Sequence, residues 1–156
     1  MQQVNAVILA AGQGTRMKSE THKVLHPIGG KAMIHHVLDS LSALDLKKSI
    51  MIVGAKREQV EAAVEGADFV VQEPQLGTGH AVQFAEDALK GHEEPTFVLC
   101  GDVPLVKPAT MSKMDDALMA GDNRPAVVVL GFKADDPKRY GRLKLADNGD
   151  LEAIIE

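Results

Sequence analysis

The sequence predicts an α/β fold with a mostly parallel central sheet. Short apolar runs alternate along the 156-residue chain with segments whose apolar residues recur at helical spacing, an order typical of α/β domains. The runs that begin at residues 4, 49, 68 and 96 lack a regular alternation of polar and apolar side chains. Such runs indicate strands buried on both faces, as in a parallel sheet. A hydrophobic content of 45% and a charged content of 25% fit one domain with a sizeable core.

The first half of the chain is predicted to supply three strands and two helices. In order, these are a strand at 4–11, a helix at 31–45, a strand at 49–53, a helix at 56–65 and a strand at 68–72. The helix at 31–45 is predicted as amphipathic because its apolar residues recur with a period of about 3.6 residues. These residues are Met33, Ile34, Val37, Leu38, Leu41 and Leu44.

The second half is predicted to add two helices, two strands and a terminal hairpin. A helix at 79–90 and a strand at 96–100 come first. The next helix begins at Pro108, where a missing N–H is tolerated, and ends near Gly121. Residues 126–131 are apolar and strand-like. The closing hairpin pairs two segments, 140–145 and 151–156, around Asp-Asn-Gly-Asp, which is typical turn chemistry.

Composition argues against several classes of protein. The formal net charge of −5 argues against binding to nucleic acid or to an anionic membrane. No stretch of the sequence approaches the roughly 20 apolar residues of a bilayer span, and no leader-like segment is recognisable, so we expect a cytoplasmic location. With Cys100 as the one cysteine, no internal disulfide is possible, and no CxxC or HExxH spacing indicates a zinc site.

Three loops at the predicted carboxyl ends of strands carry the polar residues of greatest interest. In parallel sheets these ends share one edge, where ligands bind. The first loop contains Gly12, Gly14, Thr15, Arg16 and Lys23. It lacks the spacing of a dinucleotide fingerprint or a Walker loop, but glycine N–H groups, an arginine and a lysine suit a phosphate. A solvated surface turn has the same composition, so this loop alone leaves both interpretations open.

The second and third loops extend this chemistry. Gln72, Gly77 and Thr78 lie before the helix predicted at 79–90. An amide side chain and a glycine N–H match the imide edge of a pyrimidine, while Thr78 also suits a helix cap. Asp102 closely follows the strand at 96–100, where a carboxylate beside phosphates would bind Mg²⁺. An aspartate at a strand end is also a common turn former.

Together the three loops resemble those of one family. The segments LAAGQGTRMKS, QEPQLGTGHA and CGDVPL, with Lys23, are similar to the uridyltransferase domain of bacterial bifunctional N-acetylglucosamine-1-phosphate uridyltransferases. LGTGHA is the narrowest motif, whereas the first loop is shared by many nucleotidyltransferases, including those acting on molybdopterin or isoprenoid precursors. The resemblance runs over essentially the whole chain, through Tyr-Gly-Arg at 140–142 and the closing Ile-Ile-Glu. It implies a Rossmann-like three-layer nucleotidyltransferase fold.

The resemblance also implies a reaction and the residues that serve it. The family transfers a uridylyl group from UTP to N-acetylglucosamine 1-phosphate, with Mg²⁺ as cofactor, and releases pyrophosphate without a covalent enzyme intermediate. Catalytic roles are implied for Arg16 beside the pyrophosphate, Lys23 beside the reacting phosphates and Asp102 as the metal ligand. The substrate-binding residues implied are Leu9, Ala10, Ala11, Gly12, Gly14, Thr15, Gln72, Gly77, Thr78, Cys100, Gly101, Gly141 and Glu156, of which Gly141 and Glu156 would contact the sugar.

The chain departs from the family pattern in three ways. Cys100 replaces a tyrosine, His22 replaces a common proline before Lys23, and the sequence stops at Glu156. In the family, a second metal ligand and the acetyltransferase domain that makes the enzyme a trimer follow later. We therefore expect residues 1–156 to be a uridyltransferase domain incomplete at its C-terminal end, monomeric or a weak dimer, with its nucleotide site intact and turnover impaired. A non-catalytic nucleotide-binding or regulatory module is the alternative.

Overall fold

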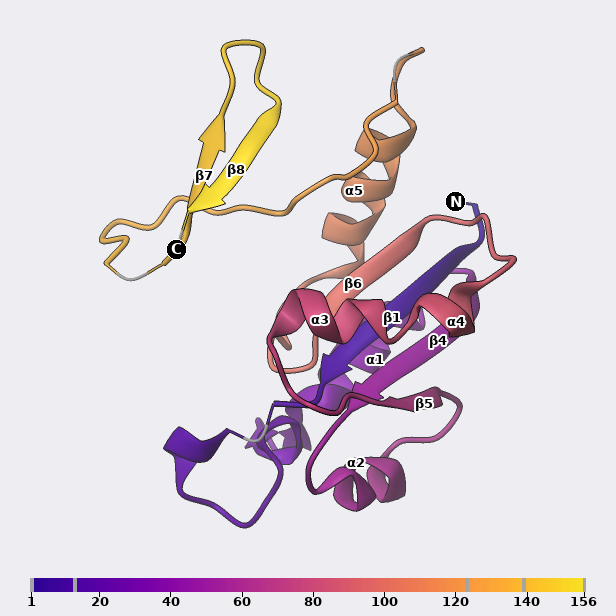
Figure 1. Cartoon of the computed structure of the whole chain (residues 1–156), viewed down its shortest axis with the longest axis vertical. Helices are drawn as coiled ribbons and strands as arrows, with labels where there is room; N and C mark the ends of the chain where they lie inside the picture. The colour runs from indigo at the N-terminus through magenta and orange to yellow at the C-terminus, as the bar shows by residue number, and fades with distance from the viewer. Residues whose placement is uncertain (1, 13, 123, 139, 156) are drawn as a thin grey trace. The chain divides into compact units, whose positions relative to one another are not determined.

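The computed structural model describes residues 2–12, 14–122, 124–138 and 140–155. These fall into two compact units, Met1–Asp115 and Asp116–Glu156. The first unit holds a four-stranded sheet in the order β5-β4-β1-β6, in which each neighbouring pair is parallel (Figure 1). The sheet confirms the predicted α/β fold with a mostly parallel centre. Its strands are β1 (Val4–Ala10), β4 (Leu46–Val53), β5 (Asp68–Val71) and β6 (Thr96–Cys100), and the helices around it include α1 (Met33–Leu41), α2 (Arg57–Ala63), α3 (Thr78–Gln83) and α4 (Glu86–Leu89).

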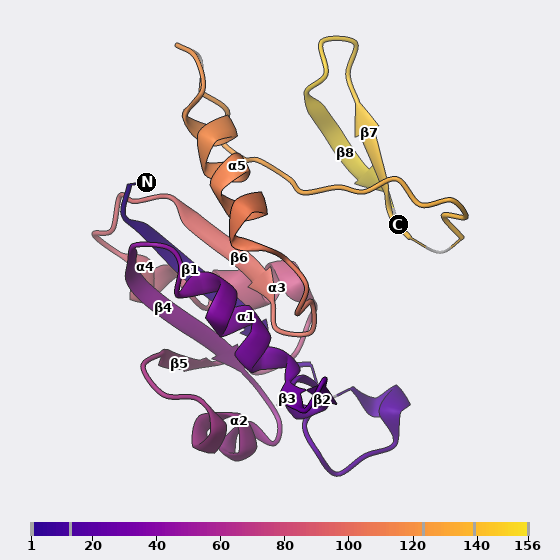
Figure 2. The ribbon, with the colours of Figure 1, turned by 180° about the vertical axis from the view of Figure 1, so that it is seen from behind.

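The central strands β1 and β4 place side chains alternately in two hydrophobic layers. Ile8 of β1 belongs to the same layer as Ile34 of α1, whereas its neighbour Val7 belongs to the opposite layer with Ala81 of α3. Figures 1 and 2 show α1 on one face of the sheet and α3 and α4 on the other. Burial on both faces therefore accounts for the missing polar alternation in these strands.

The strand order creates a switch point between β1 and β6. From β1 the chain runs through α1 to β4 and through α2 to β5, then returns through α3 and α4 to β6 on the other side of β1. Right-handed crossovers in opposite directions carry the helices to opposite faces of the sheet. In doubly wound sheets of this kind, ligands bind outside the carboxyl ends of the strands at the switch point.

A short hairpin shortens the first predicted helix. The helix predicted at 31–45 is α1, which begins two residues later because β3 (Lys31–Ala32) pairs with β2 (Pro27–Ile28). Gly29 and Gly30 form the turn between them, with φ angles of 59° and 83°. Glycine adopts such left-handed angles without a steric penalty, so the Gly-Gly pair is the local cause of the hairpin.

Two further differences lie beyond β5. The helix predicted at 79–90 is divided into α3 and α4, and the N-cap of α3 is Gly77, so Thr78 begins the helix and forms no capping hydrogen bond. The strand β6 was expected to be buried on both faces, but Val98 and Cys100 are exposed. The reason is that β6 is an edge strand of this sheet.

In the later part of the chain, the predicted helix and hairpin are confirmed and one predicted strand is wrong. The helix α5 (Pro108–Met119) begins at the predicted proline. The hairpin is confirmed as β7 (Arg142–Leu145) paired antiparallel with β8 (Leu151–Ile155). The strand expected at 126–131 is wrong, since the structure assigns no strand there; an apolar run becomes a strand only where another strand completes its hydrogen bonds. In the described residues, no helix has the length and apolar character needed to cross a membrane.

Candidate functional site

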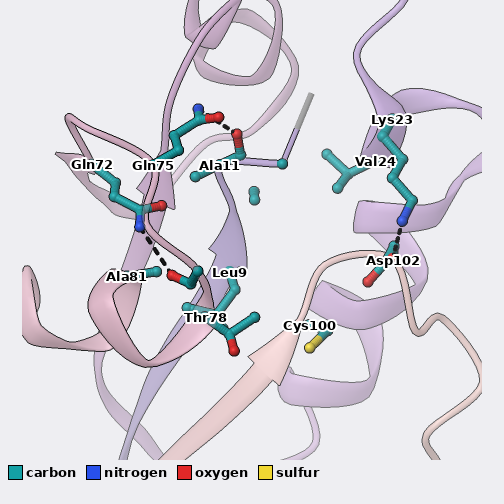
Figure 3. Close-up of a pocket in the computed structure, with 13 residues that line it drawn as sticks. Leu9, Ala11, Lys23, Val24, Gln72, Gln75, Thr78, Ala81, Cys100 and Asp102 are labelled. Carbon is teal, nitrogen blue, oxygen red and sulfur yellow. Dashed lines mark hydrogen bonds and ion pairs between the residues drawn. The ribbon is translucent and has the colours of Figure 1, made fainter. Parts of the chain in front are cut away.

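A pocket of about 270 Å³ lies at the carboxyl edge of the parallel sheet (Figure 3). The strand register aligns Ala10 with Val53, and Leu9 with Cys100, so the loops that follow these strands begin at the same edge. The pocket is lined by Leu9, Ala10, Ala11, Gly12, Lys23, Val24, Gln72, Gln75, Gly77, Thr78, Ala81, Cys100 and Asp102. The three loops singled out in the sequence therefore do meet at one place.

Most of the site residues expected from the sequence line this pocket. They are Leu9, Ala10, Ala11, Gly12, Lys23, Gln72, Gly77, Thr78, Cys100 and Asp102. Sequence reasoning missed three lining residues: Val24, Gln75 and Ala81. Gln75 was recognisable as a second amide in the loop after β5, whereas no sequence signal separated Val24 and Ala81 from ordinary core residues.

Gln72 forms one wall of the pocket and is only 4% exposed. Its Nε2 donates to the carbonyl oxygen of Gly77 at 3.0 Å and lies 3.2 Å from Nδ1 of His80. In Figure 3 the Oε1 atom of Gln72 points away from the hydrogen bond to Gly77. The side chain therefore offers a ligand its acceptor rather than its donors.

Gln75 joins the loop after β5 to the end of β1. Its Nε2 donates to the carbonyl oxygen of Ala11 at 2.7 Å. The side chain crosses directly over Gly54, where a Cβ would lie 2.0 Å from this nitrogen and 2.9 Å from the Ala11 oxygen. The crossing therefore requires a residue without a side chain at the end of β4.

The opposite wall carries an ion pair between Lys23 and Asp102, drawn in Figure 3. Both side chains are 33% exposed, so they remain within reach of a ligand. Cys100 lies beside them on the pocket wall. Partial burial raises the pKa of the Cys100 thiol, the Asp102 carboxylate raises it further, and the Lys23 ammonium partly offsets both. The thiol is therefore protonated at neutral pH.

The backbone just before Lys23 is fastened to α2. The side-chain amide of Gln59 accepts from the His22 N–H at 2.8 Å and donates to the Glu20 carbonyl oxygen at 3.0 Å. Lys56 Nζ also donates to the Glu20 carbonyl oxygen, at 3.1 Å. Since α2 packs into the core through Val60, which is 0% exposed, these contacts tie the loop carrying Lys23 to a rigid element.

His22 itself is an unusual buried histidine. Its side chain is 1% exposed, and neither ring nitrogen has a hydrogen-bond partner among the residues that the structure describes. Burial lowers the pKa of His22, and the positive charge of Lys56 lowers it further. The imidazole is therefore neutral at pH 7, which is the form that a buried site without partners tolerates.

Several expected site residues lie outside the pocket lining. Thr15 and Arg16 belong to an exposed 3-10 turn, η1 (Thr15–Met17). Gly14 has a φ of 64° and packs against Lys23, whose Cβ would be 2.7 Å from a Cβ at Gly14. Gly101 is buried beneath the pocket, and its N–H donates to the Leu9 carbonyl oxygen at 2.9 Å.

The two residues expected to contact the sugar lie outside the first unit, which holds this pocket. Gly141 belongs to the second unit, 116–156, and Glu156 lies outside the described residues. Their roles rest on the sequence resemblance. The pocket in the first unit is thus built from the residues expected to contact the nucleotide and the metal.

Residues 6–147 match the family model of the MobA-like NTP transferase domain. The chain belongs to this family. This MobA-like domain is 54% identical over 154 residues to the bifunctional protein GlmU of Sphingopyxis alaskensis, an alignment that covers 98% of the chain and 34% of that protein. The chain therefore spans about a third of the length of the curated relatives it matches. These matches confirm the resemblance inferred from the three loops.

Solved structures confirm the fold of the MobA-like domain. A putative glucose-1-phosphate thymidylyltransferase from Bacillus anthracis aligns with a TM-score of 0.72 at 22% identity, covering 98% of this chain and 64% of that one. A Mycobacterium tuberculosis protein in complex with manganese aligns with a TM-score of 0.61 at 26% identity, covering 74% of this chain and 59% of that one. The chain is thus a nucleotidyltransferase domain in both sequence and fold.

Proposed function

We propose that this domain transfers a uridylyl group from UTP to N-acetylglucosamine 1-phosphate, giving UDP-N-acetylglucosamine and pyrophosphate, with Mg²⁺ as its metal. The observation that carries the proposal is one pocket with two different ends. Gln72 offers an amide acceptor at one end, and Lys23 and Asp102 lie at the other. The family match across residues 6–147 spans both compact units, which supports treating residues 1–156 as a single functional domain.

The amide end of the pocket favours uracil among the bases. Uracil presents an N3–H donor between two carbonyl acceptors. The Oε1 atom of Gln72 would accept from N3–H, and the backbone N–H of Gly77 would donate to a uracil oxygen. Because Gln72 is only 4% exposed, these hydrogen bonds would form largely out of water. A base that left the buried amide without a partner would lose binding free energy there.

The other end of the pocket fits a triphosphate and a hard divalent ion. Among the described residues, no group of three or more His, Cys, Asp or Glu side chains is placed to hold a metal. Mg²⁺ needs few protein ligands, because phosphate oxygens and waters complete its shell. The Asp102 carboxylate supplies the kind of oxygen ligand that Mg²⁺ prefers. The manganese complex of a similar protein supports a divalent metal in general.

In the proposed reaction, a phosphate oxygen of the sugar phosphate attacks the α-phosphorus of UTP. A new P–O bond forms as the bond to the β-phosphate oxygen breaks, and pyrophosphate leaves with its electron pair. Bound Mg²⁺ would neutralise phosphate charge. Lys23 would add a second positive charge beside the reacting phosphates, and Arg16 would approach the pyrophosphate from its exposed turn. Positioning and charge neutralisation would therefore carry the catalysis.

Isothermal titration calorimetry with Mg²⁺ tests the base assignment. We expect UTP to bind more tightly than ATP or GTP, because adenine lacks the neighbouring N–H and oxygen that uracil presents to Gln72 and Gly77, and guanine presents such a pair only on a larger, two-ring base. Replacing Gln72 with alanine should reduce this preference by about tenfold. A coupled assay for pyrophosphate release then tests the acceptor sugar phosphate. Equal affinity for all three nucleotides in the unmodified chain would contradict the proposed function.

A further inference from the structure

The orientation of the Gln72 amide is fixed by two acceptors inside the protein. Its terminal nitrogen lies 3.0 Å from the Gly77 carbonyl oxygen and 3.2 Å from Nδ1 of His80. A carbonyl oxygen only accepts hydrogen bonds, so the atom facing Gly77 must be the amide nitrogen. Since that nitrogen only donates, Nδ1 of His80 must accept in this contact, which places the ring proton on Nε2. Both N–H groups of Gln72 are then used, and Oε1 is left for a ligand.

The His80 ring is itself held in place. It packs edge-on against Phe84, with the ring centroids 5.0 Å apart and the planes at 79°. His80 belongs to α3, and Phe84 is the residue that caps this helix. Pairs of rings in this geometry are favourable beyond their buried area. The acceptor that faces Gln72 is therefore positioned by contacts within α3 and its C-cap, before any ligand binds.

We propose that His80 is a specificity-determining positioning residue, which holds the Gln72 amide with its oxygen toward the pocket and thereby selects an imide base over cytosine. The inference rests on the proposed function, because it concerns the base end of the same site. Uracil and thymine present N3–H to the amide oxygen, whereas cytosine presents an N3 lone pair. A freely rotating amide would serve either base by turning its nitrogen toward the ligand. Because Nδ1 of His80 accepts from the second N–H of the Gln72 amide, the amide cannot turn its nitrogen toward the ligand.

Two substitutions at His80 distinguish the role of its acceptor atom Nδ1 from the role of its ring packing. His80→Phe keeps an aromatic ring against Phe84 but removes Nδ1. His80→Asn lacks the ring but places an amide oxygen near the position of Nδ1. A variant at an exposed residue of the same helix, Gln83→Ala, controls for changes in α3. Calorimetry with Mg²⁺ and UTP, dTTP or CTP gives the ratio of Kd values for CTP and UTP in each variant.

The expected result is a change in base preference, not in nucleotide binding as a whole. The unmodified chain and His80→Asn should favour UTP and dTTP over CTP, whereas His80→Phe should lower the CTP-to-UTP ratio of Kd values by about tenfold. An unchanged ratio of Kd values in His80→Phe would overturn the role of Nδ1. An equal fall of this ratio in His80→Phe and His80→Asn would overturn it as well. Either result leaves the UTP preference of the unmodified chain standing. If the unmodified chain does not prefer UTP, the proposed function fails first, and this inference with it.

A measurement on the unmodified chain keeps the inference testable if a variant does not fold. Nitrogen-15 NMR of the histidine rings distinguishes the two neutral tautomers. We expect the His80 ring to carry its proton on Nε2 at neutral pH, with Nδ1 accepting from Gln72. A proton on Nδ1 would place two donors face to face and would overturn the inference without any substitution.

Discussion

At the scale of single residues, the pocket depends on the missing side chain of Gly54. A Cβ there would lie 2.0 Å from the Gln75 nitrogen and 2.9 Å from the Ala11 oxygen. The Ala11 oxygen belongs to buried backbone just after β1, whereas Gln75 meets the added Cβ with the end of a flexible side chain. Gly54→Ala should therefore push Gln75 away from its acceptor. We expect the free energy of unfolding to fall by about 1–3 kcal/mol, measured by urea denaturation.

Two further variants distinguish this clash from a general effect of alanine. Gly54→Ala combined with Gln75→Ala removes the flexible partner of the clash and should recover part of the lost stability. Gly79→Ala serves as a matched control, because a Cβ at this position meets nothing within 4 Å and alanine favours the helix. A Gly54→Ala variant as stable as the unmodified chain would contradict the crossing of Gln75 over β4.

His22 predicts a dependence of stability on acidic pH. Burial, and then the charge of Lys56, lower the pKa of His22 in the folded chain, whereas the unfolded chain keeps a pKa of about 6.5. The unfolded state therefore binds the proton more readily, and stability present above the unfolded pKa is lost as the pH falls through and below it. Denaturation at a series of pH values should show this loss, and His22→Leu should reduce it. An identical pH dependence in His22→Leu would rule out His22 as the cause.

The sequence predicted pocket-lining residues where their position along the chain was enough to place them. Gln72 ends one predicted strand and Asp102 closely follows another, so the edge of the sheet brings them together. Gln59 was not found, because its role depends on hydrogen bonds to residues 37 and 39 positions away. Gly54 was missed for a related reason, since only the path of Gln75 across it shows why a glycine is needed there.

At the scale of secondary-structure elements, α2 acts as the support of the loop that carries Lys23. Gln59→Ala removes both amide contacts with Glu20 and His22, so Lys23 should lose its fixed position. We expect UTP to bind about tenfold more weakly, with little change for uridine, which lacks the phosphates. Calorimetry with the two ligands measures the difference.

The matched control for Gln59→Ala is Glu61→Ala on the same helix. Glu61 is exposed and its nearest charged partner is Arg57, at 3.8 Å, so its loss should leave the affinity for UTP unchanged. Equal losses for UTP and uridine in Gln59→Ala would show that α2 supports the whole pocket instead of the phosphate end.

The elements that sequence patterns predicted least well are those that depend on a partner. The Gly-Gly pair at 29–30 forms the turn of a hairpin only because the two residues before it pair antiparallel with the two residues after it. Conversely, residues 126–131 have the apolar composition of a strand, yet Val127 is 71% exposed and no strand forms there. Local composition indicates that a segment can form a strand, but the ladder that completes it is a property of the assembled sheet.

At the scale of the whole molecule, the order of the elements decided the fold and the site together. Alternating strands and helices predicted a parallel sheet, and the sheet predicted that its carboxyl edge would hold the ligand. The strand order was not predictable from periodicity, because each helix can carry the chain in either direction along the sheet. The reversal after β5, which places β6 beside β1, is what brings Asp102 and Cys100 opposite Gln72.

The division of the chain into two units leads to the last prediction. All residues that line the pocket lie in the first unit. A chain ending at Ala120 keeps the whole of α5, including buried Met111 and the hydrogen bond from Gln2 to Asp115 at 2.9 Å. We therefore expect it to fold, as judged by its thermal unfolding, and to bind UTP with unchanged affinity. Transfer to N-acetylglucosamine 1-phosphate should fall by at least about a hundredfold, because the proposed sugar contacts at Gly141 and Glu156 are gone. Loss of UTP binding from a folded 1–120 chain would mean that the second unit contributes to the nucleotide site, whereas full transfer activity would remove both sugar contacts from the proposal.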